Sequence, residues 1–148
     1  MYFHISSPDQ TIYQGEVLQV TLPTPQGEIT ILPTHIPLIS IVVPGIVKIK
    51  TEKIESDMDR IYDNDQIQIS ISKGLVYIDG SHISVLTSIA TTNPQETQEV
   101  LLANKANLEL KIQETNIETS PEEYENIMVE LMKIQADLKL LKSKGMYS

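Results

Sequence analysis

The sequence predicts an antiparallel β-sandwich of about ten strands, followed by a C-terminal antiparallel hairpin of two helices. Two observations predict this fold class. Five of the six glycines and six of the eight prolines lie within the first 80 residues, where apolar residues recur with a period of two. Beyond residue 93 the apolar residues recur at steps of three and four. We therefore place a β-sandwich domain at residues 1–88 and an α-helical hairpin at residues 89–148.

The clearest strand covers residues 66–72, in which Ile67, Ile69 and Ile71 alternate with Gln and Ser residues. Strict alternation predicts a strand that is half buried against a core. Similar runs between turn residues predict eight further strands, at residues 2–6, 11–14, 17–22, 28–32, 38–43, 46–51, 75–79 and 82–87.

Turns and one charged segment complete the β-rich part of the chain. Asp79 and Gly80 stand between two predicted strands and indicate a tight hairpin turn. Residues 52–65 carry many charges, and we interpret them as a loop with one short edge strand. Because aromatic residues are sparse and Trp is absent, the core must be built mostly from Ile, Leu and Val.

Two similar signatures predict where the helices begin. Residues 93–96 read Asn-Pro-Gln-Glu, which offers a cap residue, a proline at the first helical position and an acid at the third. Residues 120–123 read Ser-Pro-Glu-Glu and repeat the signature. We therefore expect the helices to start near Pro94 and Pro121.

The second helix carries one apolar seam at alternating steps of three and four, made of Tyr124, Ile127, Leu131, Ile134, Leu138 and Leu141. The short segment at residues 115–119 predicts that the two helices fold back on each other. Two helices alone are marginally stable in water, so the hairpin must pack on the β-domain or on a partner. A helical pair with more than one docking surface is suited to act as a two-state element.

The composition excludes several classes of function. A formal net charge of −9 argues against nucleic-acid binding and against direct adsorption to, or insertion into, anionic lipid. The absence of Cys excludes disulfides and thiolate sites. The longest apolar stretch, residues 36–43, is too short to span a bilayer, and no signal peptide is recognised. We expect a soluble protein whose membrane association comes through partners.

Catalytic and metal-binding patterns are missing from the sequence. The histidines His4, His35 and His82 are too far apart in the chain to suggest a metal pair, and only His35, in a predicted loop, invites a contact role. Acidic clusters at residues 52–59 and 63–65 lack the spacing of a calcium loop and are interpreted as solvated. No phosphate-binding or dinucleotide signature is present. The sequence therefore predicts a protein that is not an enzyme and carries no catalytic residues, metal or cofactor.

Four lysines concentrate late in the second helix, namely Lys133, Lys139, Lys142 and Lys144. They follow three glutamates near its start, Glu122, Glu123 and Glu125. This distribution complements the helix dipole. Alternatively, the lysines contact an acidic partner.

Three segments resemble a known family. Residues 27–38 read Gly-Glu-Ile-Thr-Ile-Leu-Pro-Thr-His-Ile-Pro-Leu and resemble the signature of the epsilon subunits of rotary F-type ATP synthases, in which Gly-Glu leads through a strand to Leu-Pro-x-His-x-Pro-Leu. Pro-Gly-Ile-Val-Lys-Ile at residues 44–49 follows at the expected distance. Residues 71–78 and 82–86 resemble the later Ser-Gly-Gly strand pair, with Lys73 in place of the first Gly. The resemblance covers essentially the whole chain.

The resemblance implies a ten-stranded sandwich that binds the gamma subunit at the foot of the central stalk and rests on the membrane c-ring. It implies a non-catalytic rotor subunit that couples proton transport to ATP synthesis, peripheral to the cytoplasmic face of a bacterial inner membrane. The family's ring-facing loop carries over to Glu28, Thr34 and His35. In bacterial members the hairpin either folds onto the sandwich or extends toward the alpha and beta catalytic subunits and inhibits hydrolysis. That extension would give the late lysines an acidic partner.

Some members of this family bind ATP through Asp-x-x-Arg-Ala at the start of the first helix. Here Thr97 stands at the Asp position, Val100 at the Arg position and Leu101 at the Ala position. Because a cation for phosphate is missing, we expect no nucleotide binding at these residues.

Two other functions remain open at this point. The first is a stand-alone β-sandwich module that binds a ligand or peptide and oligomerises through its helical tail. Such modules usually display exposed aromatic residues, and one Phe and six Tyr give little for that platform. The second is a jelly-roll enzyme, which would need a His or carboxylate metal set that the sequence does not show.

Overall fold

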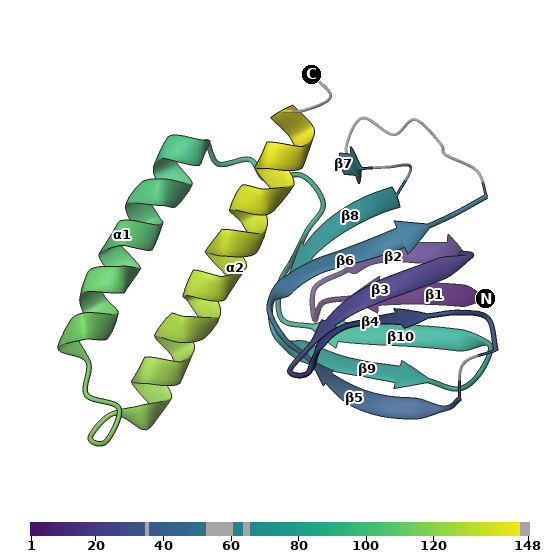
Figure 1. The fold of residues 1–148 in the computed structure, drawn as a ribbon, viewed down its shortest axis with the longest axis horizontal. Helices are drawn as coiled ribbons and strands as arrows, with labels where there is room; N and C mark the ends of the chain where they lie inside the picture. The colour runs from purple at the N-terminus through teal and green to yellow at the C-terminus, as the bar shows by residue number, and fades with distance from the viewer. Residues whose placement is uncertain (35, 53–60, 64–65, 146–148) are drawn as a thin grey trace.

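The computed structural model describes residues 1–34, 36–52, 61–63 and 66–145. Over these residues eleven strands precede two helices, which confirms the predicted sandwich and hairpin (Figure 1). The strands are β1 (Tyr2–Ser6), β2 (Thr11–Glu16), β3 (Gln19–Thr24), β4 (Gly27–Ile31), β5 (Leu38–Val42), β6 (Gly45–Lys50), β7 (Ile61–Asp63), β8 (Gln66–Ile71), β9 (Gly74–Ile78), β10 (His82–Thr87) and β11 (Ala90–Thr91). The helices are α1 (Gln98–Glu114) and α2 (Pro121–Gly145).

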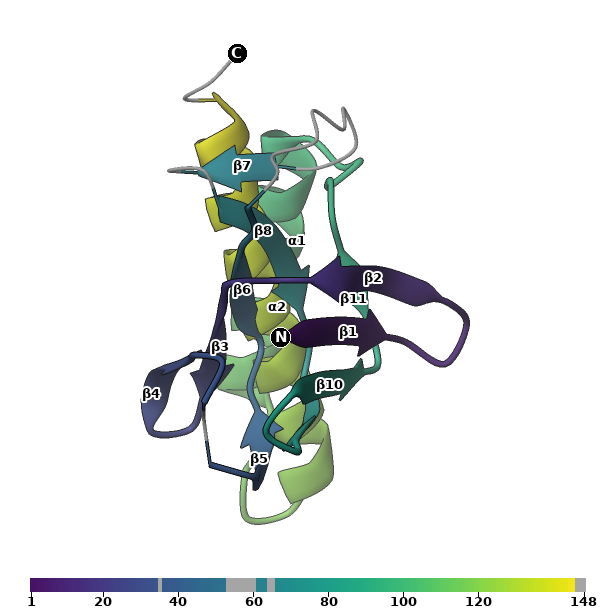
Figure 2. The ribbon, with the colours of Figure 1, turned by 90° about the vertical axis from the view of Figure 1, so that its right-hand side faces the viewer.

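The strands form two sheets that pack face to face. The first sheet has the order β2-β1-β10-β9-β5, and the second has the order β11-β8-β6-β3-β4, with β7 also pairing with β8. Strands of the two sheets run across each other in Figure 2. All described pairs are antiparallel except β1 with β10, which is parallel from Tyr2↔His82 to Ser6↔Leu86. The sequence did not predict this pair, because its strands are joined through the rest of the sandwich and not by a turn.

The edge of β8 opposite β6 pairs with two short strands. β7 pairs with residues 66–68, and β11 pairs with residues 70–71. β7 confirms the short edge strand predicted within residues 52–65. β11 continues the sheet to Thr91, beyond the domain boundary predicted at residue 88. The chain therefore leaves the sandwich only after Thr91.

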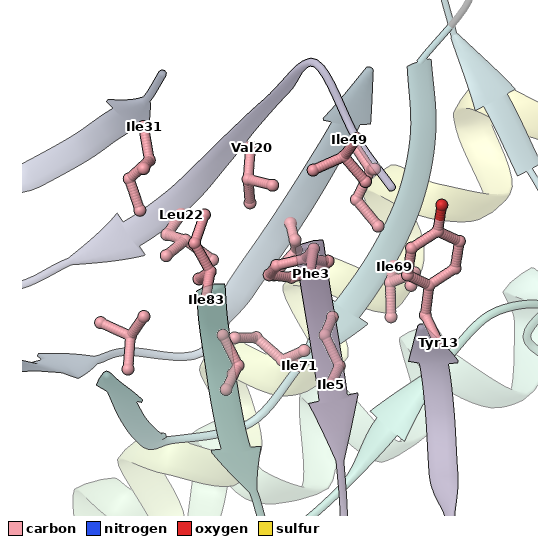
Figure 3. Packing of buried hydrophobic residues seen from close by; sticks show 14 of the residues in the cluster. Phe3, Ile5, Tyr13, Val20, Leu22, Ile31, Ile49, Ile69, Ile71 and Ile83 are labelled. Carbon is pink, nitrogen blue, oxygen red and sulfur yellow. The ribbon is translucent and has the colours of Figure 1, made fainter. Parts of the chain in front are cut away.

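Aliphatic side chains fill the space between the sheets, as predicted from the composition. Figure 3 shows Phe3, Leu22, Ile49, Ile71 and Ile83 converging from strands of both sheets. The rings of Phe3 and Tyr13 lie 6.0 Å apart, centroid to centroid. The buried cluster consists of Phe3, Ile5, Tyr13, Val17, Val20, Leu22, Ile31, Val42, Val47, Ile49, Ile67, Ile69, Ile71, Val76, Ile78, Ile83 and Val85.

Two glycines allow the tight turn and the close approach of the strand pair β9–β10. Gly80 has a φ of 101°, a left-handed conformation that favours glycine, and it completes the predicted turn with Asp79. A Cβ at Gly74 would lie 2.0 Å from the carbonyl oxygen of Leu86. Gly74 is therefore required for the close approach of β9 and β10, whereas its neighbour Lys73 is exposed.

The two helix starts were predicted with different success. α2 begins at Pro121, and its first hydrogen bond runs from Tyr124 N to Ser120 O at 3.0 Å. The prediction that α1 starts near Pro94 was wrong by four residues. Pro94 is buried in the segment between β11 and α1, and Thr97 is the cap, because its Oγ1 accepts from Val100 N at 3.3 Å.

The hairpin is folded down on the sandwich. α2 contacts β6, β7 and β8, and it lies between α1 and the second sheet (Figure 1). The helices meet through Leu108, Ile127 and Leu131, with Ile112 and Ile134 packed against them. Neither helix of the described chain is long and apolar enough to span a membrane.

Candidate functional site

The described residues contain no group of three His, Cys, Asp or Glu side chains placed to hold a metal ion. His4 lies 3.5 Å from the hydroxyl of Thr11, and the ring of His82 lies 5.9 Å from that of Tyr2. His35 lies outside the residues that the structure describes, as does most of the acidic segments 52–59 and 63–65. The surfaces of the molecule are therefore the candidates for function.

One surface is an exposed apolar sheet face on β5, β9 and β10. The strand register places Ile39 opposite Tyr77, Ile41 opposite Leu75, and Leu75 opposite Leu86. These five residues form what we term the apolar face, and between 52% and 69% of each is exposed. The alternate residues of the same strands point into the core. A contiguous patch of large exposed apolar side chains indicates an interaction surface.

The rest of the same sheet face is polar. Continuing across the pairing of β10 with β1 and of β1 with β2, the outward positions carry Ser84, His4 and Gln14. The apolar face is therefore confined to one half of the sheet, next to the edge strand β5. Sequence analysis missed it, although strands 38–43 and 75–79 gave a signal: both carry apolar residues on both of their faces.

The predicted ring-contact residues lie near the start and after the end of β4. Glu28 is 58% exposed at its side chain and lies 3.5 Å from Nζ of Lys48. Thr34 is exposed in the following loop. The apolar residues Leu32 and Ile36 of that loop are also exposed, by 52% and 78%. This loop thus combines exposed polar and apolar side chains, and its role as a contact site stays a prediction.

The four late lysines of α2 do not share one environment. Lys139 and Lys142 are exposed, whereas the side chain of Lys144 lies outside the described part. Lys133 is only 9% exposed and faces the sandwich. In this conformation Lys133 is not available to contact another subunit, because the sheet covers it.

Lys133 belongs to a polar network between α2 and the second sheet. Its Nζ donates to Oδ1 of Asp137 at 2.7 Å, to Oγ of Ser70 at 3.0 Å and to Oγ1 of Thr91 at 3.0 Å. The Ser70 hydroxyl also donates to Asp137. Sequence analysis could not find these partners, because Ser70 and Thr91 are 63 and 42 residues away from Lys133.

The segment that replaces the nucleotide motif has structural roles in this state. Thr97 caps α1, Val100 is 45% exposed and Leu101 is 3% exposed. A hollow of about 460 Å³ beside Leu101 is lined by Lys133 together with three carboxylates, Glu96, Glu130 and Asp137. Because the charge of this lining is negative, it disfavours phosphate. The absence of nucleotide binding stays a prediction.

Comparisons with known proteins agree on one family. Residues 1–93 match the family described as ATP synthase, Delta/Epsilon chain, beta-sandwich domain. An ATP synthase epsilon chain of Dichelobacter nodosus is 28% identical over 142 residues, which are 94% of this chain and 92% of that protein. The ATP synthase epsilon chain of Alkalihalophilus pseudofirmus is 30% identical over 87 residues, which are 59% and 57% of the two chains.

Solved structures share the fold. A chain in the structure of the Euglena gracilis mitochondrial ATP synthase, which includes OSCP, F1 and the c-ring, aligns with a TM-score of 0.71 at 19% identity and covers 93% of this chain and 78% of that chain. A chain from the central stalk and c-ring of the Tetrahymena thermophila mitochondrial ATP synthase aligns with a TM-score of 0.51 at 10% identity, covering 72% and 87%.

Proposed function

Because this chain belongs to the delta/epsilon chain family of ATP synthase and is a non-catalytic subunit, we propose that it is a rotor subunit of the central stalk, which links the gamma subunit to the membrane c-ring. In this role it transmits rotation and so couples proton transport to ATP synthesis. The ring holds it as a peripheral subunit on the cytoplasmic face of a bacterial inner membrane. The assemblies in which the two similar solved chains occur support this placement.

The observation that carries the proposal is the apolar face. Five large side chains on three strands are exposed in the isolated chain, although its formal net charge is −9. Burying such a patch against a partner is favourable by about 25 cal/mol per Å² of apolar surface. We assign this face to the gamma subunit, because it is a broad and rigid sheet surface on one side of the sandwich.

We assign the ring contact to β4 and the loop after it. Glu28, Thr34 and His35 are the polar residues of this proposed contact, and the exposed Leu32 and Ile36 supply apolar area. The loop leads into one end of β5, whereas the apolar face is the outward side of β5, β9 and β10. Two separate surfaces on one rigid sandwich allow the chain to join two partners.

The hairpin supplies regulation in this proposal. Folded down, as in this structure, α2 holds Lys133 against the sandwich. Extended, it would present Lys133, Lys139, Lys142 and Lys144 to acidic surfaces of the catalytic alpha and beta subunits and slow hydrolysis. A ligand or partner shifts such an equilibrium only through its different affinity for the two states.

A matched pair of substitutions tests the two surfaces. Leu75 of the apolar face and Leu32 of the loop are both 52% exposed, so replacing each with Asp makes the same chemical change at equal exposure. We expect Leu75→Asp to weaken binding to purified gamma subunit by about tenfold or more, because it places a charge at the centre of the patch. Leu32→Asp should leave gamma binding within about twofold and instead weaken binding of the chain–gamma complex to detergent-solubilised c-ring.

Equal effects of the two variants on gamma binding would contradict the assignment of the surfaces. Neither variant should unfold the chain, because exposed substitutions usually change stability by less than about half a kcal/mol. Thermal unfolding of both variants checks this. Failure of the unsubstituted chain to bind gamma subunit at all would contradict the proposed function itself.

A further inference from the structure

Along β8, the sandwich surface beneath α2 is polar although it is buried. Gln68, Ser70 and Ser72 are exposed by 4%, 0% and 4%, and they alternate along the chain with the core residues of β8. Side chains of this kind are as well suited to water as to a covering helix. Along β8, the outer face of this sheet can therefore be either covered by a helix or exposed to water, unlike the face that points into the core.

The Lys133 ammonium group uses its full hydrogen-bonding capacity in the docked state. A lysine has three N–H donors, and the three oxygens around Nζ belong to Asp137, Ser70 and Thr91, at 2.7 to 3.0 Å. Ser70 also bonds to Asp137, so the four side chains form a closed network. β8 and β11 each contribute one hydroxyl to it, and α2 contributes both charges.

Both charges of the network lie on the same helix. Lys133 and Asp137 are four residues apart on α2, so they are neighbours whether or not α2 is docked. When α2 leaves the sheet, the pair stays together on the helix, and the Ser70 and Thr91 hydroxyls bond to water. Release therefore leaves no charge buried without a partner.

A shifted docking position would be unfavourable for the opposite reason. It would bury the ion pair against a sheet surface without the two hydroxyls that complete the network. An incompletely paired charge in a buried site is strongly unfavourable. The apolar contacts of α2 with the sheet are few, since the buried apolar residues on the helix face that carries Lys133 and Asp137 are Ala136 and Leu140. Small apolar contacts alone would not fix one position along the sheet.

We propose that Lys133 and Asp137 form a register latch, which lets α2 dock on β8 and β11 in one position and leave it without stranding a buried charge. The network specifies the docked position more than it holds the helix there. Buried polar groups are known to fix register in packed helices in this way. The latch also hides Lys133 until α2 is released, a consequence that rests on the proposed function of the hairpin.

The docking equilibrium can be measured on the isolated full chain. The sequence contains no Cys, so cysteines introduced at the exposed positions Ser88 and Glu125 are the only thiols for spin labels. The distance distribution between the labels then gives the docked and released populations. Because this experiment needs no partner subunit, its result tests the latch independently of the proposed function in the central stalk.

Three variants and one control test the latch. We expect Asp137→Ala, which leaves Lys133 unpaired, to lower the ratio of docked to released chain about tenfold or more. Thr91→Val has nearly the same shape but lacks the hydroxyl, and should lower the ratio by about three- to tenfold. Its control is Thr92→Val at the next residue, which should leave the ratio within about twofold. The double variant Lys133→Met with Asp137→Leu should dock with a broader distance distribution, because nothing fixes its position.

Three results would overturn the latch. One is that Asp137→Ala and Thr91→Val behave like Thr92→Val. Another is that the double variant docks with the narrow distribution of the unsubstituted chain, since something else would then set the position. The third is that the double variant stays released, because the network would then provide attraction and not register. Far-UV circular dichroism of each variant confirms that the helices are still formed.

Discussion

The two faces of β8 are both buried, and their chemistry is opposite. Ile67, Ile69 and Ile71 face the first sheet within the sandwich core. The intervening Gln68 and Ser70 lie beneath α2 with similarly low exposure. This difference indicates which contact is permanent and which is reversible. An apolar face exposed to water is costly, whereas a polar face meets water without penalty once its cover is removed.

The apolar contacts of the hairpin indicate in the same way that it is an appendage and not part of the core. The helices share a small apolar cluster of their own around Leu108, Ile127 and Leu131. That cluster does not depend on the sheet, so the helical pair can leave the sandwich without dissolving its own contacts. The sandwich core in turn has no contribution from the helices in the cluster that fills it, within the described residues.

Substitutions on the two faces of β8 should differ most in their effect on the free energy of unfolding. Ile69→Ala removes a core side chain that is 1% exposed, and it should lower the free energy of unfolding of the sandwich by about 2–5 kcal/mol. Ser70→Ala at the next residue should lower it by less than about 1 kcal/mol, because the sandwich can lose α2 and stay folded. Urea unfolding of the full chain, followed by amide signals of β1 and β3, measures both values. Similar losses would mean that the hairpin face belongs to the core.

A cavity under α2 should affect docking alone. Leu140 is fully buried on α2, and Leu140→Ala should weaken docking by up to about 2–5 kcal/mol while the urea midpoint of the sandwich stays unchanged. Leu110→Ala on α1, where the side chain is 59% exposed, is the control and should change docking by less than about half a kcal/mol. Amide exchange of α2 gives the docking free energy. A drop in the sandwich midpoint for Leu140→Ala would argue that the two parts unfold together.

Removing the hairpin should have a smaller effect on stability but should alter regulation. Truncation after Asn93 keeps β11, which pairs with β8 and would be lost by cutting before Ala90. We expect truncation to lower the free energy of unfolding by less than Ile69→Ala does, since the residues of β8 that α2 covers are polar. In the reconstituted enzyme, ATP hydrolysis should rise, because the state that slows rotation is gone. Unchanged hydrolysis would show that the hairpin is a brace and not an inhibitor.

The smallest expected effect concerns the turn before β10. Hydrogen bonds from the backbone N–H groups of His82, at 2.8 Å, and Ser81, at 3.3 Å, hold the pKa of Asp79 below its ordinary value. A lowered folded-state pKa means that the stabilisation is present above the ordinary pKa of about 3.9 and is lost as the pH falls through the folded pKa. Asp79→Asn should remove this part of the acid dependence. A carboxyl titration by NMR that places Asp79 at or above its ordinary pKa would contradict it.

Local patterns in the sequence were sufficient for the main elements. The alternation of Ile67, Ile69 and Ile71 predicted a half-buried strand, and the start of α2 at Pro121 was correct. These features depend on periodicity and capping, which act within a few residues of the chain.

Contacts between distant segments were not predictable in this way. The polar positions of β8 indicated nothing of a covering helix, because a buried polar residue and a solvated one look alike in sequence. Lys133 was grouped with the exposed lysines for the same reason. The first helix was placed at Pro94 because residues 93–96 match the signature of a helix start, whereas the cap in the structure is Thr97, four residues after Asn93.

Native-state amide hydrogen exchange on the full chain tests most directly whether the hairpin is a releasable part of a stable sandwich. Amides of α1 and α2 should exchange through an opening of lower free energy than the amides of β3, β6 and β8, and Leu140→Ala should lower the first value without changing the second. One common free energy of opening for helices and core strands, lowered equally by Leu140→Ala, would show that the hairpin and the sandwich open as one unit.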